Sequence, residues 1–453
     1  MTKPPRSFQQ RQAQAPVPPP PGLNARLVAA SVLADVAGQG STLDERLGAE
    51  TSTRMTDLDP RDRALVRSIT TVALRRLGTI RAALARFLEK GLPKKAAAVE
   101  WTLITAAAQI LFLDVPDHAA VDLAVHAIRR DPRTAAFGSL VNAVLRNVIR
   151  AREELLSPAD PFIDTPAWLA ARWRKTYGDE IAAAIVRAHQ LEPTLDLTVK
   201  QDAQAWAEKL GGFVLPTGSI RLLNHAPIAD LPGYEEGAWW VQDGAASLPA
   251  RLLRAEPGMR VADLCAAPGG KTAQLAHAGA QVIALDRSAE RMKRVSANLE
   301  RLKLQADLSI GDALSFEAPA FDAVLLDAPC TSTGTIRRHP DVAWTKRASD
   351  IASLAKLQAG MIDHAIDLLK PGGALVYCTC SLEPEEGELQ ISALLRRNPD
   401  VARVPITADE LGVPNVCISP VGDLRTLPCH LYDEDARRSG FDGFFAARVM
   451  RLV

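Results

Sequence analysis

The sequence predicts an α/β protein, in which a domain built on a parallel sheet follows an all-α domain and a small α+β segment. Residues 23–150 repeat apolar side chains at helical spacing and are rich in alanine. From residue 250 onward, short β-type runs alternate with helical patterns, which is typical of parallel sheets. A chain of 453 residues has room for two or three such domains.

Composition and the positions of proline- and glycine-rich turns divide the chain into four segments. We expect a flexible proline-rich arm over 1–22, an all-α domain over 23–152, the α+β segment over 160–240 and the α/β domain over 241–453. The arm lacks the apolar stretch of a signal peptide, and no apolar run has the length needed to cross a bilayer. We therefore expect a cytoplasmic monomer with no membrane partner.

The formal net charge is zero, but the first 150 residues hold 21 Lys and Arg against 13 Asp and Glu. A basic domain suits a polyanionic partner such as RNA, and the solvated surface of a helix explains the same excess equally well. The basic run in question comprises Arg61, Arg63, Arg67, Arg75, Arg76, Arg81 and Arg86.

Within the α+β segment, helical patterns over 168–189 and 202–210 accompany a strand pattern over 195–199 and a return to strand over 211–223. The segment ends at two adjacent tryptophans, Trp239 and Trp240. Neighbouring residues of a strand point to opposite faces, so we expect both rings to pack in a core or at a domain interface, with stacking on a base as the minority interpretation.

The α/β domain is predicted from four successive strands, over 260–264, 281–285, 306–310 and 321–326. A long amphipathic helix over 351–369 follows, and Lys370-Pro371-Gly372-Gly373 closes it. The remaining predicted elements are a strand over 374–378, a helix over 383–397 and a last strand over 443–449.

A tight turn joins the first of these strands to a helix, and its residues are Cys265, Ala266, Ala267, Pro268, Gly269, Gly270 and Lys271. Glycines let the backbone approach a ligand closely, and the N–H groups that begin a helix are free to bind one. The Gly-Gly-Lys-Thr ending resembles a phosphate loop, but that pattern needs a glycine where Cys265 stands. The dinucleotide pattern G-x-G-x-x-G is also absent.

Acidic residues follow the next three strands, namely Asp286, Asp312 and Asp327. In open α/β sheets, ligands bind at the carboxyl ends of the strands, and a carboxylate there can accept both hydroxyls of a ribose. A single acidic strand end is more often a turn or a helix cap. Three in succession beside the glycine turn favour an adenosyl ligand without a phosphate tail.

Two cysteines also follow strands of this sheet, Cys330 after Asp327 and Cys380 after the strand over 374–378. The six cysteines include no C-x-x-C pair and the eight histidines are scattered, so we expect no metal. A thiolate that adds to C6 of a pyrimidine makes C5 nucleophilic toward the methyl group of S-adenosylmethionine. A carboxyl group such as Asp327 would select cytosine, and Lys271 would help to make the site electropositive enough to ionise a thiol.

These residues together resemble a known family. Asp-Ala-Pro-Cys at 327–330, Thr-Cys-Ser at 379–381 and Cys-Ala-Ala-Pro-Gly-Gly-Lys at 265–271 are similar to motifs of the RNA cytosine-5 methyltransferases. The helical domain ahead of an α+β segment further resembles the Sun/Fmu (RsmB) type, whose extension is similar to NusB. The resemblance implies a Rossmann-like class I methyltransferase domain, S-adenosylmethionine as cofactor and 16S ribosomal RNA as substrate, methylated at cytosine 967.

The resemblance also assigns roles. It implies that Cys380 is the nucleophile and that Cys330 assists product release, with Cys330 as the alternative nucleophile because DNA cytosine methyltransferases use the cysteine at that position. It places residues 265–271, Asp286, Asp312 and Asp327 around the cofactor. The chain departs from the family pattern at Thr331-Ser332, where Ser-Gly is usual, and at Gly387, where Asn is frequent.

Two alternative functions stay open at this point. A tRNA cytosine-5 methyltransferase would share every catalytic residue, and a non-catalytic NusB-like RNA-binding factor would use only the helical domain.

The loop Arg337-Arg338-His339-Pro340 lies shortly after Cys330, and we expect it to contact RNA phosphates. The other interpretation is that its charges are solvated. A target base in a duplex would have to leave its stack to expose C6.

Overall fold

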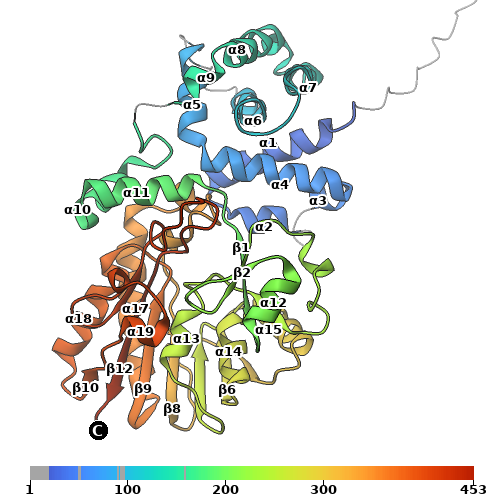
Figure 1. Ribbon diagram of the computed structural model, residues 1–453. Helices are drawn as coiled ribbons and strands as arrows, with labels where there is room; N and C mark the ends of the chain where they lie inside the picture. Colours follow the sequence, from blue (N-terminus) through green and yellow to red (C-terminus); the bar gives the residue numbers. More distant parts are fainter. Residues whose placement is uncertain (1–19, 49–52, 89–90, 92–96, 158–159) are drawn as a thin grey trace, which may run out of the picture.

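The computed structural model describes residues 20–48, 53–88, 91, 97–157 and 160–453. Three parts follow one another along the chain, a helical domain, a small α+β part and an α/β domain (Figure 1). The predicted fold class is confirmed. The proline-rich arm lies outside the described residues, except for residues 20–22.

The helical domain packs around one central helix, α6 (Ala97–Phe112), which is buried along most of its length. Helices α1, α4, α5, α7 and α8 all contact it, because its alanines let neighbouring helices approach closely. The helices around it are α1 (Leu23–Gln39), α2 (Leu43–Leu47), α3 (Thr53–Thr56), α4 (Pro60–Arg75), α5 (Leu77–Arg86), α7 (Asp117–Arg130), α8 (Gly138–Arg150) and α9 (Arg152–Leu155).

The α+β part contains a four-stranded sheet of order β2-β3-β1-β4. Its elements are α10 (Ala167–Tyr177), α11 (Asp179–Gln190), β1 (Leu195–Val199), α12 (Ala203–Leu210), β2 (Phe213–Val214), β3 (Ile220–Leu222) and β4 (Trp239–Val241). Both adjacent tryptophans are buried. Trp239 packs in the core of this small sheet, and Trp240 packs against Met292 and Leu299 of the α/β domain, so the packing prediction is confirmed.

The α/β domain is built on an eight-stranded sheet of order β10-β12-β9-β8-β5-β6-β7, with β11 paired to β12. Strands β5 to β9 run parallel, and β12 is antiparallel to β9 and β10. The strands are β5 (Arg260–Leu264), β6 (Gln281–Asp286), β7 (Asp307–Ile310), β8 (Phe321–Asp327), β9 (Leu369–Thr379), β10 (Val401–Arg403), β11 (Leu424–Thr426) and β12 (Phe444–Arg451). The helices are α13 (Leu248–Leu252), α14 (Gly270–His277), α15 (Ala289–Arg301), α16 (Val342–Thr345), α17 (Ala348–Asp367), α18 (Glu388–Arg397) and α19 (Ala408–Leu411).

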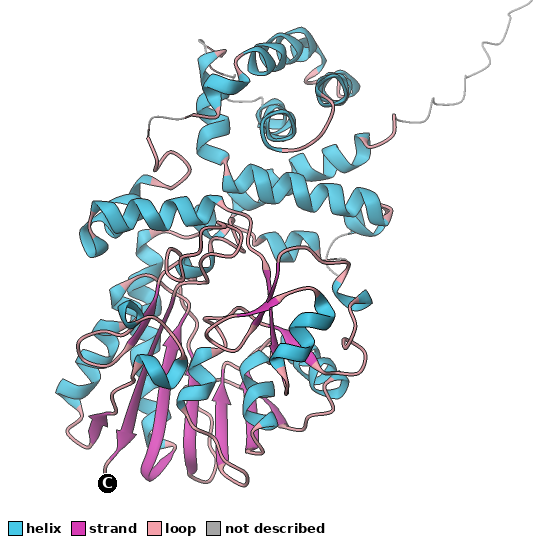
Figure 2. Ribbon diagram, viewed as in Figure 1, coloured by secondary structure: helices cyan, strands magenta, loops and turns pink. Residues whose placement is uncertain are grey.

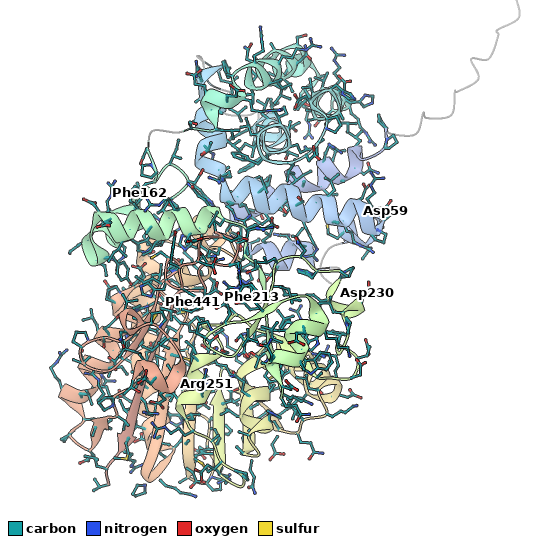
Figure 3. All side chains as sticks on the ribbon, in the orientation of Figure 1. Asp59, Phe162, Phe213, Asp230, Arg251 and Phe441 are labelled. Atoms are coloured by element: carbon teal, nitrogen blue, oxygen red, sulfur yellow. The ribbon has the colours of Figure 1, made fainter. Side chains whose placement is uncertain are left out.

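Helices cover both faces of this sheet (Figure 2). Side chains of a strand alternate between faces, so Leu325 packs toward α13 and α14, whereas Leu326 packs toward α17 and α18. Side chains fill the space between the layers, where Phe441 is buried, whereas Phe162 is buried against α10 and α11 of the α+β part (Figure 3). All five parallel strands therefore direct their carboxyl ends toward one edge, where the loops of the site lie.

The structure differs from the expected elements at two places. Residues 370–373 do not follow the long helix as a loop but form an irregular start of β9, with a register shift against β8. The helix expected over 383–397 is divided into a 3-10 turn (Pro384–Glu386) and α18, which meet at Gly387. A Cβ at Gly387 would lie 2.9 Å from the ring of Phe445, so packing against β12 explains the glycine at this departure from the family pattern.

Candidate active site

The carboxyl ends of the parallel strands surround a pocket of about 340 Å³. Seven of the residues expected at the site line it, namely Cys265, Ala267, Asp286, Asp312, Asp327, Cys330 and Cys380. Helix α17 adds Leu357 and Met361, which the sequence patterns did not single out. The structure therefore brings residues from five strand ends, those of β5 to β9, to one cavity.

The turn between β5 and α14 forms one wall. Cys265 takes a left-handed backbone conformation with φ 67°, and Gly269 begins the helix with φ 100°. A Cβ at Gly269 would lie 3.1 Å from the side chain of Val295, so glycine also lets α15 pack closely. Ala266, Pro268, Gly269 and Gly270 build this turn and do not line the cavity.

Asp286 is 3% exposed and is fixed at the end of β6. Its carboxylate accepts hydrogen bonds from the N–H of Ala267 at 3.2 Å and of Ser288 at 2.9 Å, and the Arg291 guanidinium lies at 3.3 Å. Two carboxylate oxygens offer about four acceptor positions, so Asp286 retains capacity for a hydroxyl donor in the cavity. Asp312 is exposed, and its carboxylate accepts from the N–H of Leu314 at 2.9 Å.

The two predicted cysteines face each other, with Cys330 Sγ and Cys380 Sγ 3.5 Å apart. Parallel pairing of β8 and β9 places the residues that follow them side by side. The hydrogen bond with Cys380, together with burial, favours the protonated thiol of Cys330 and raises its pKa well above its ordinary value. The expected lowering of a thiol pKa is therefore not found at Cys330.

The remaining cysteines near the site are poor nucleophiles. Burial, followed by the negative charge of Asp327, raises the pKa of Cys378 well above its ordinary value, and its Sγ lies 3.5 Å from the Asp327 carboxylate. Burial, with smaller contributions from Asp327 and Asp286, raises the pKa of Cys265 to about 12.

Lys271 lies behind the pocket and does not line it. Its ammonium group donates to the Asp327 carboxylate at 2.7 Å and lies 5.0 Å from the ring of Phe444. Burial is the largest single effect and would lower the pKa of Lys271, but the attraction and hydrogen bond of Asp327, with smaller contributions from Cys378 and Cys380, together outweigh it and the pKa is raised. Lys271 therefore stays charged and holds Asp327 at the edge of the cavity.

Ser332 lines the pocket beside Cys330 and has φ 60°, a left-handed conformation that a glycine adopts without strain. This is the position where the family pattern usually has glycine. The Ser332 hydroxyl lies 3.9 Å from Cys330 Sγ. The departure thus changes the chemistry next to a thiol without changing the path of the loop.

The structure does not support the expectation that Arg337 and Arg338 contact RNA phosphates. Arg337 is 2% exposed. Arg338 lies among three buried carboxylates, Asp243 at 2.5 Å, Asp442 at 3.3 Å and Asp196 at 3.8 Å, and their attraction outweighs its burial and raises its pKa. Arg338 thus forms ion pairs with both the α+β part and the α/β domain. A run of basic residues in the sequence could not reveal these tertiary partners.

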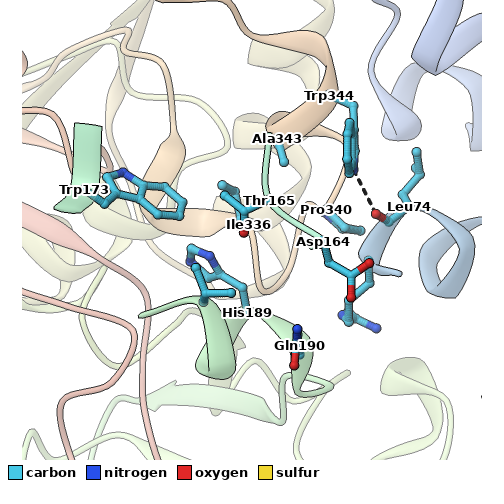
Figure 4. Close-up of a pocket in the computed structure, with 12 residues that line it drawn as sticks. Leu74, Asp164, Thr165, Trp173, His189, Gln190, Ile336, Pro340, Ala343 and Trp344 are labelled. Atoms are coloured by element: carbon cyan, nitrogen blue, oxygen red, sulfur yellow. Dashed lines mark hydrogen bonds between the residues drawn. The ribbon is translucent and has the colours of Figure 1, made fainter. Parts of the chain in front are cut away.

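The same loop also contacts the helical domain. Trp344 Nε1 donates to the carbonyl of Leu74 at 2.8 Å, and Arg75 donates to the carbonyl of Arg337 at 3.0 Å. A cavity of about 20 Å³ lies at this junction, between Trp173, His189 and Trp344 (Figure 4). It has room for roughly one water molecule and is too small for a substrate.

The seven arginines of the basic run differ in exposure, and Arg63 is half-buried and donates to the carbonyl of Leu58 at 3.1 Å. Arg75 is buried at the junction, and Arg76 lies 3.6 Å from Asp164. Arg61, Arg67, Arg81 and Arg86 are exposed. Contact of the exposed group with RNA stays a prediction.

Within the described ranges, no cluster of three or more His, Cys, Asp or Glu side chains has a geometry that could hold a metal ion. A search of the same residues for a helix of sufficient length and apolar character to span a membrane finds none.

Known proteins match both main parts of the chain. The family described as 16S rRNA methyltransferase RsmB/F matches residues 250–450, and the NusB family matches residues 23–150. Ribosomal RNA small subunit methyltransferase B of Vibrio cholerae is 36% identical over 402 residues, covering 84% of this chain and 91% of the relative. The protein of the same name from Xanthomonas campestris is 38% identical over 405 residues, covering 85% and 91%.

Solved structures share the fold. The crystal structure of PH0851 covers 96% of this chain and 99% of its own, with a TM-score of 0.72 and 23% identity. A methyltransferase homolog protein from Pyrococcus horikoshii covers 65% of this chain and 100% of its own, with a TM-score of 0.53 and 27% identity.

Proposed function

The chain belongs to the RsmB/F family of 16S rRNA methyltransferases, and we propose that it methylates C5 of a cytosine in 16S ribosomal RNA through a covalent cysteine adduct. The observation that carries this proposal is the pair of thiols, Cys330 and Cys380, 3.5 Å apart in the cavity that the strand-end carboxylates line. One thiol beside a carboxylate is a common buried arrangement. Two that face one pocket can serve successive steps of one reaction.

S-adenosylmethionine fits the groups that the pocket offers. The cavity volume of about 340 Å³ suits a nucleoside-sized ligand, and Asp286 keeps acceptor capacity at the end of β6, where a ribose would bind. Cys265, Ala267 and Asp312 line the same cavity. When bound, this cofactor supplies an electrophilic methyl group on its sulfonium.

Cys380 acts as the nucleophile in this proposal. Its thiolate adds to C6 of the cytosine, a C–S bond forms, and electron density moves to C5, which can then accept a methyl group. Loss of the C5 proton to a base restores the aromatic ring and expels the Cys380 thiolate. Cys330, at 3.5 Å, is placed to assist this second step.

Asp327 orients the base. Its side chain is 30% exposed to the pocket, and Lys271 holds one carboxylate oxygen at 2.7 Å. An ionised carboxylate at this position can accept a hydrogen bond from the exocyclic amine of cytosine, and uracil has a carbonyl oxygen there instead, so the contact distinguishes the two bases. The buried ammonium also moderates the negative charge that Asp327 presents to an attacking thiolate.

Methyl incorporation from labelled cofactor into 16S rRNA tests the proposal. Cys380→Ala should abolish incorporation, and Cys330→Ala should accumulate a covalent protein–RNA adduct because release is impaired. Cys429→Ala is the matched control, since this cysteine lies outside the pocket. Activity retained by Cys380→Ala would refute the proposal.

The relatives' names favour ribosomal RNA over tRNA as substrate. Bisulfite sequencing of both RNAs from a strain lacking the protein separates the two. We expect loss of one methylcytosine in 16S rRNA and an unchanged tRNA pattern, and the reverse would select the tRNA alternative.

A further inference from the structure

Glu386 is a fully buried carboxylate that none of the steps above uses. It ends the 3-10 turn that follows the Cys380 loop, and its side chain points back between the two cysteine loops. Burying a carboxylate is costly unless it is hydrogen-bonded, so the position of each donor around it is informative.

Both cysteine loops donate to this single carboxylate. From the loop of Cys330, the N–H of Thr331 lies 3.0 Å from Oε1, and the Thr331 hydroxyl donates to Oε2. From the loop of Cys380, the Ser381 hydroxyl donates to Oε2 at 2.6 Å. Thr331 and Ser381 immediately follow Cys330 and Cys380 in the chain. Glu386 therefore binds the residue next to each cysteine.

A third group extends the network to the other side of Cys330. Gln358 of α17 donates from Nε2 to Glu386 Oε1 at 3.1 Å and to the carbonyl of Pro329 at 2.9 Å. The residues before and after Cys330 are thus both tied to Glu386. Thr331, Ser381 and Gln358 are each 0% exposed, so no water competes for these bonds.

The donors require a carboxylate in this place. Two N–H and two O–H groups converge on it, and an ionised carboxylate is the side-chain group that only accepts. Burial raises the pKa of Glu386, and these hydrogen bonds oppose that rise by favouring the ionised form. A glutamine side chain has the same shape, but its NH₂ group would face at least one of these donors and could not accept a hydrogen bond from it. Hydrogen bonds to a charged acceptor are also shorter and stronger than neutral ones.

We propose that Glu386 is a positioning residue that holds Cys330 and Cys380 in register for adduct formation and release. This inference rests on the proposed function and deepens it, since Glu386 contacts neither substrate nor cofactor in this role. The geometry of two thiols 3.5 Å apart then depends on one residue outside both cysteine motifs.

Glu386→Gln tests the proposal by changing the acceptor with little change in volume. We expect kcat for methyl transfer to fall by about 10- to 100-fold, as for a small misplacement of reacting groups. The KM for S-adenosylmethionine should stay unchanged, because Glu386 does not line the cavity. If Glu386 only stabilised the fold, the variant would contain less folded protein, but each folded molecule would keep the wild-type kcat. Rates are therefore normalised to the amount of bound cofactor.

Glu385→Gln is the matched control. Glu385 is the preceding residue and pairs with Arg172 at 2.6 Å, away from both cysteine loops, so kcat should remain at the wild-type value. Cys380→Ala is assayed in parallel. If Cys380→Ala is inactive while Glu386→Gln keeps the wild-type kcat, the positioning role is refuted and the proposed function stands; if Cys380→Ala is active, the proposed function itself fails.

Ser381→Ala and Thr331→Val keep the proposal falsifiable if Glu386→Gln does not fold. Each removes one hydroxyl donor and leaves the carboxylate bonded to the others. Each should lower kcat with an unchanged cofactor KM. Wild-type kcat in both variants would overturn the inference.

Discussion

Replacing Arg338 by methionine tests whether this arginine is a structural cation or a contact for RNA. Methionine keeps most of the side-chain volume and removes the guanidinium. Arg338 is 20% exposed, whereas Asp243 and Asp442 are 4% and 6% exposed, so both carboxylates would stay buried with one partner fewer. Arg338→Met should therefore perturb stability far more than RNA binding.

Removing one member of a buried ion pair costs about 3–5 kcal/mol, because an uncompensated charge is left inside. We expect the lower end of this range. Arg221 still pairs with Asp196 at 2.7 Å, and Arg337 adds a nearby positive charge that favours ionised Asp442. Urea unfolding followed by fluorescence measures the loss.

Arg437→Met is the matched control, since Arg437 pairs with Asp435 at 2.9 Å on the surface. Exposed pairs contribute little, so this variant should unfold like the wild type. The KM for RNA should be the same in both variants. If Arg338→Met unfolds like Arg437→Met and its KM for RNA rises strongly, then the phosphate-contact interpretation is right and the structural one is refuted.

Three further substitutions have defined outcomes. Ser332→Gly should raise the free energy of unfolding by about 1 kcal/mol in urea unfolding, because it relieves the left-handed backbone at φ 60°, and Ser332→Ala should not. Trp344→Phe should lower it by about 1 kcal/mol by removing the bond to Leu74, and an unchanged midpoint would show that the bond contributes nothing. Burial lowers the pKa of His189 from 6.5 to about 3, so the contribution of His189 to stability is full above pH 6.5 and is lost as the pH falls toward 3, by up to about 1.4 kcal/mol per unit. His189→Phe should reduce the acid slope when unfolding midpoints are compared at pH 7 and pH 5, while His430, whose pKa burial lowers to about 4, keeps its own share; a slope equal to that of the wild type would contradict the reasoning.

The sequence predicts the parallel sheet well because each strand end carries its own local signal. Asp286 and Asp327 follow β-type runs directly, and the observed strands β6 and β8 end at these two residues. Local patterns also explain the turn, since only its glycines allow the close approach of α15 to Gly269. Because the carboxyl ends of parallel strands meet at one edge of the sheet, these residues can be predicted to lie together without any knowledge of long-range contacts.

Glu386 and Arg338 show what a single sequence does not reveal. Glu386 reads as one of several acidic residues before a helix, and its partner Thr331 is 55 residues away. Arg338 belongs to a basic loop that we expected to contact RNA phosphates, yet its carboxylate partners come from three separate segments, one of them 142 residues earlier at Asp196. Both side chains obtain their roles from tertiary partners that leave no periodic pattern.

The segment after Cys330 connects the active site physically to the helical domain. It passes from the pocket through the Arg338 network to Asp341, whose carboxylate accepts the N–H of Leu43 at 3.0 Å, and then to Trp344, which bonds Leu74. A chain lacking the helical domain would leave the buried Asp341 carboxylate without this donor and expose the Trp344 ring. Each lost hydrogen bond costs about 1 kcal/mol, so the segment that follows Cys330 should be less ordered in the shortened chain. The helical domain therefore contacts the segment that follows Cys330 directly, and this support is separate from any contact that the domain makes with RNA.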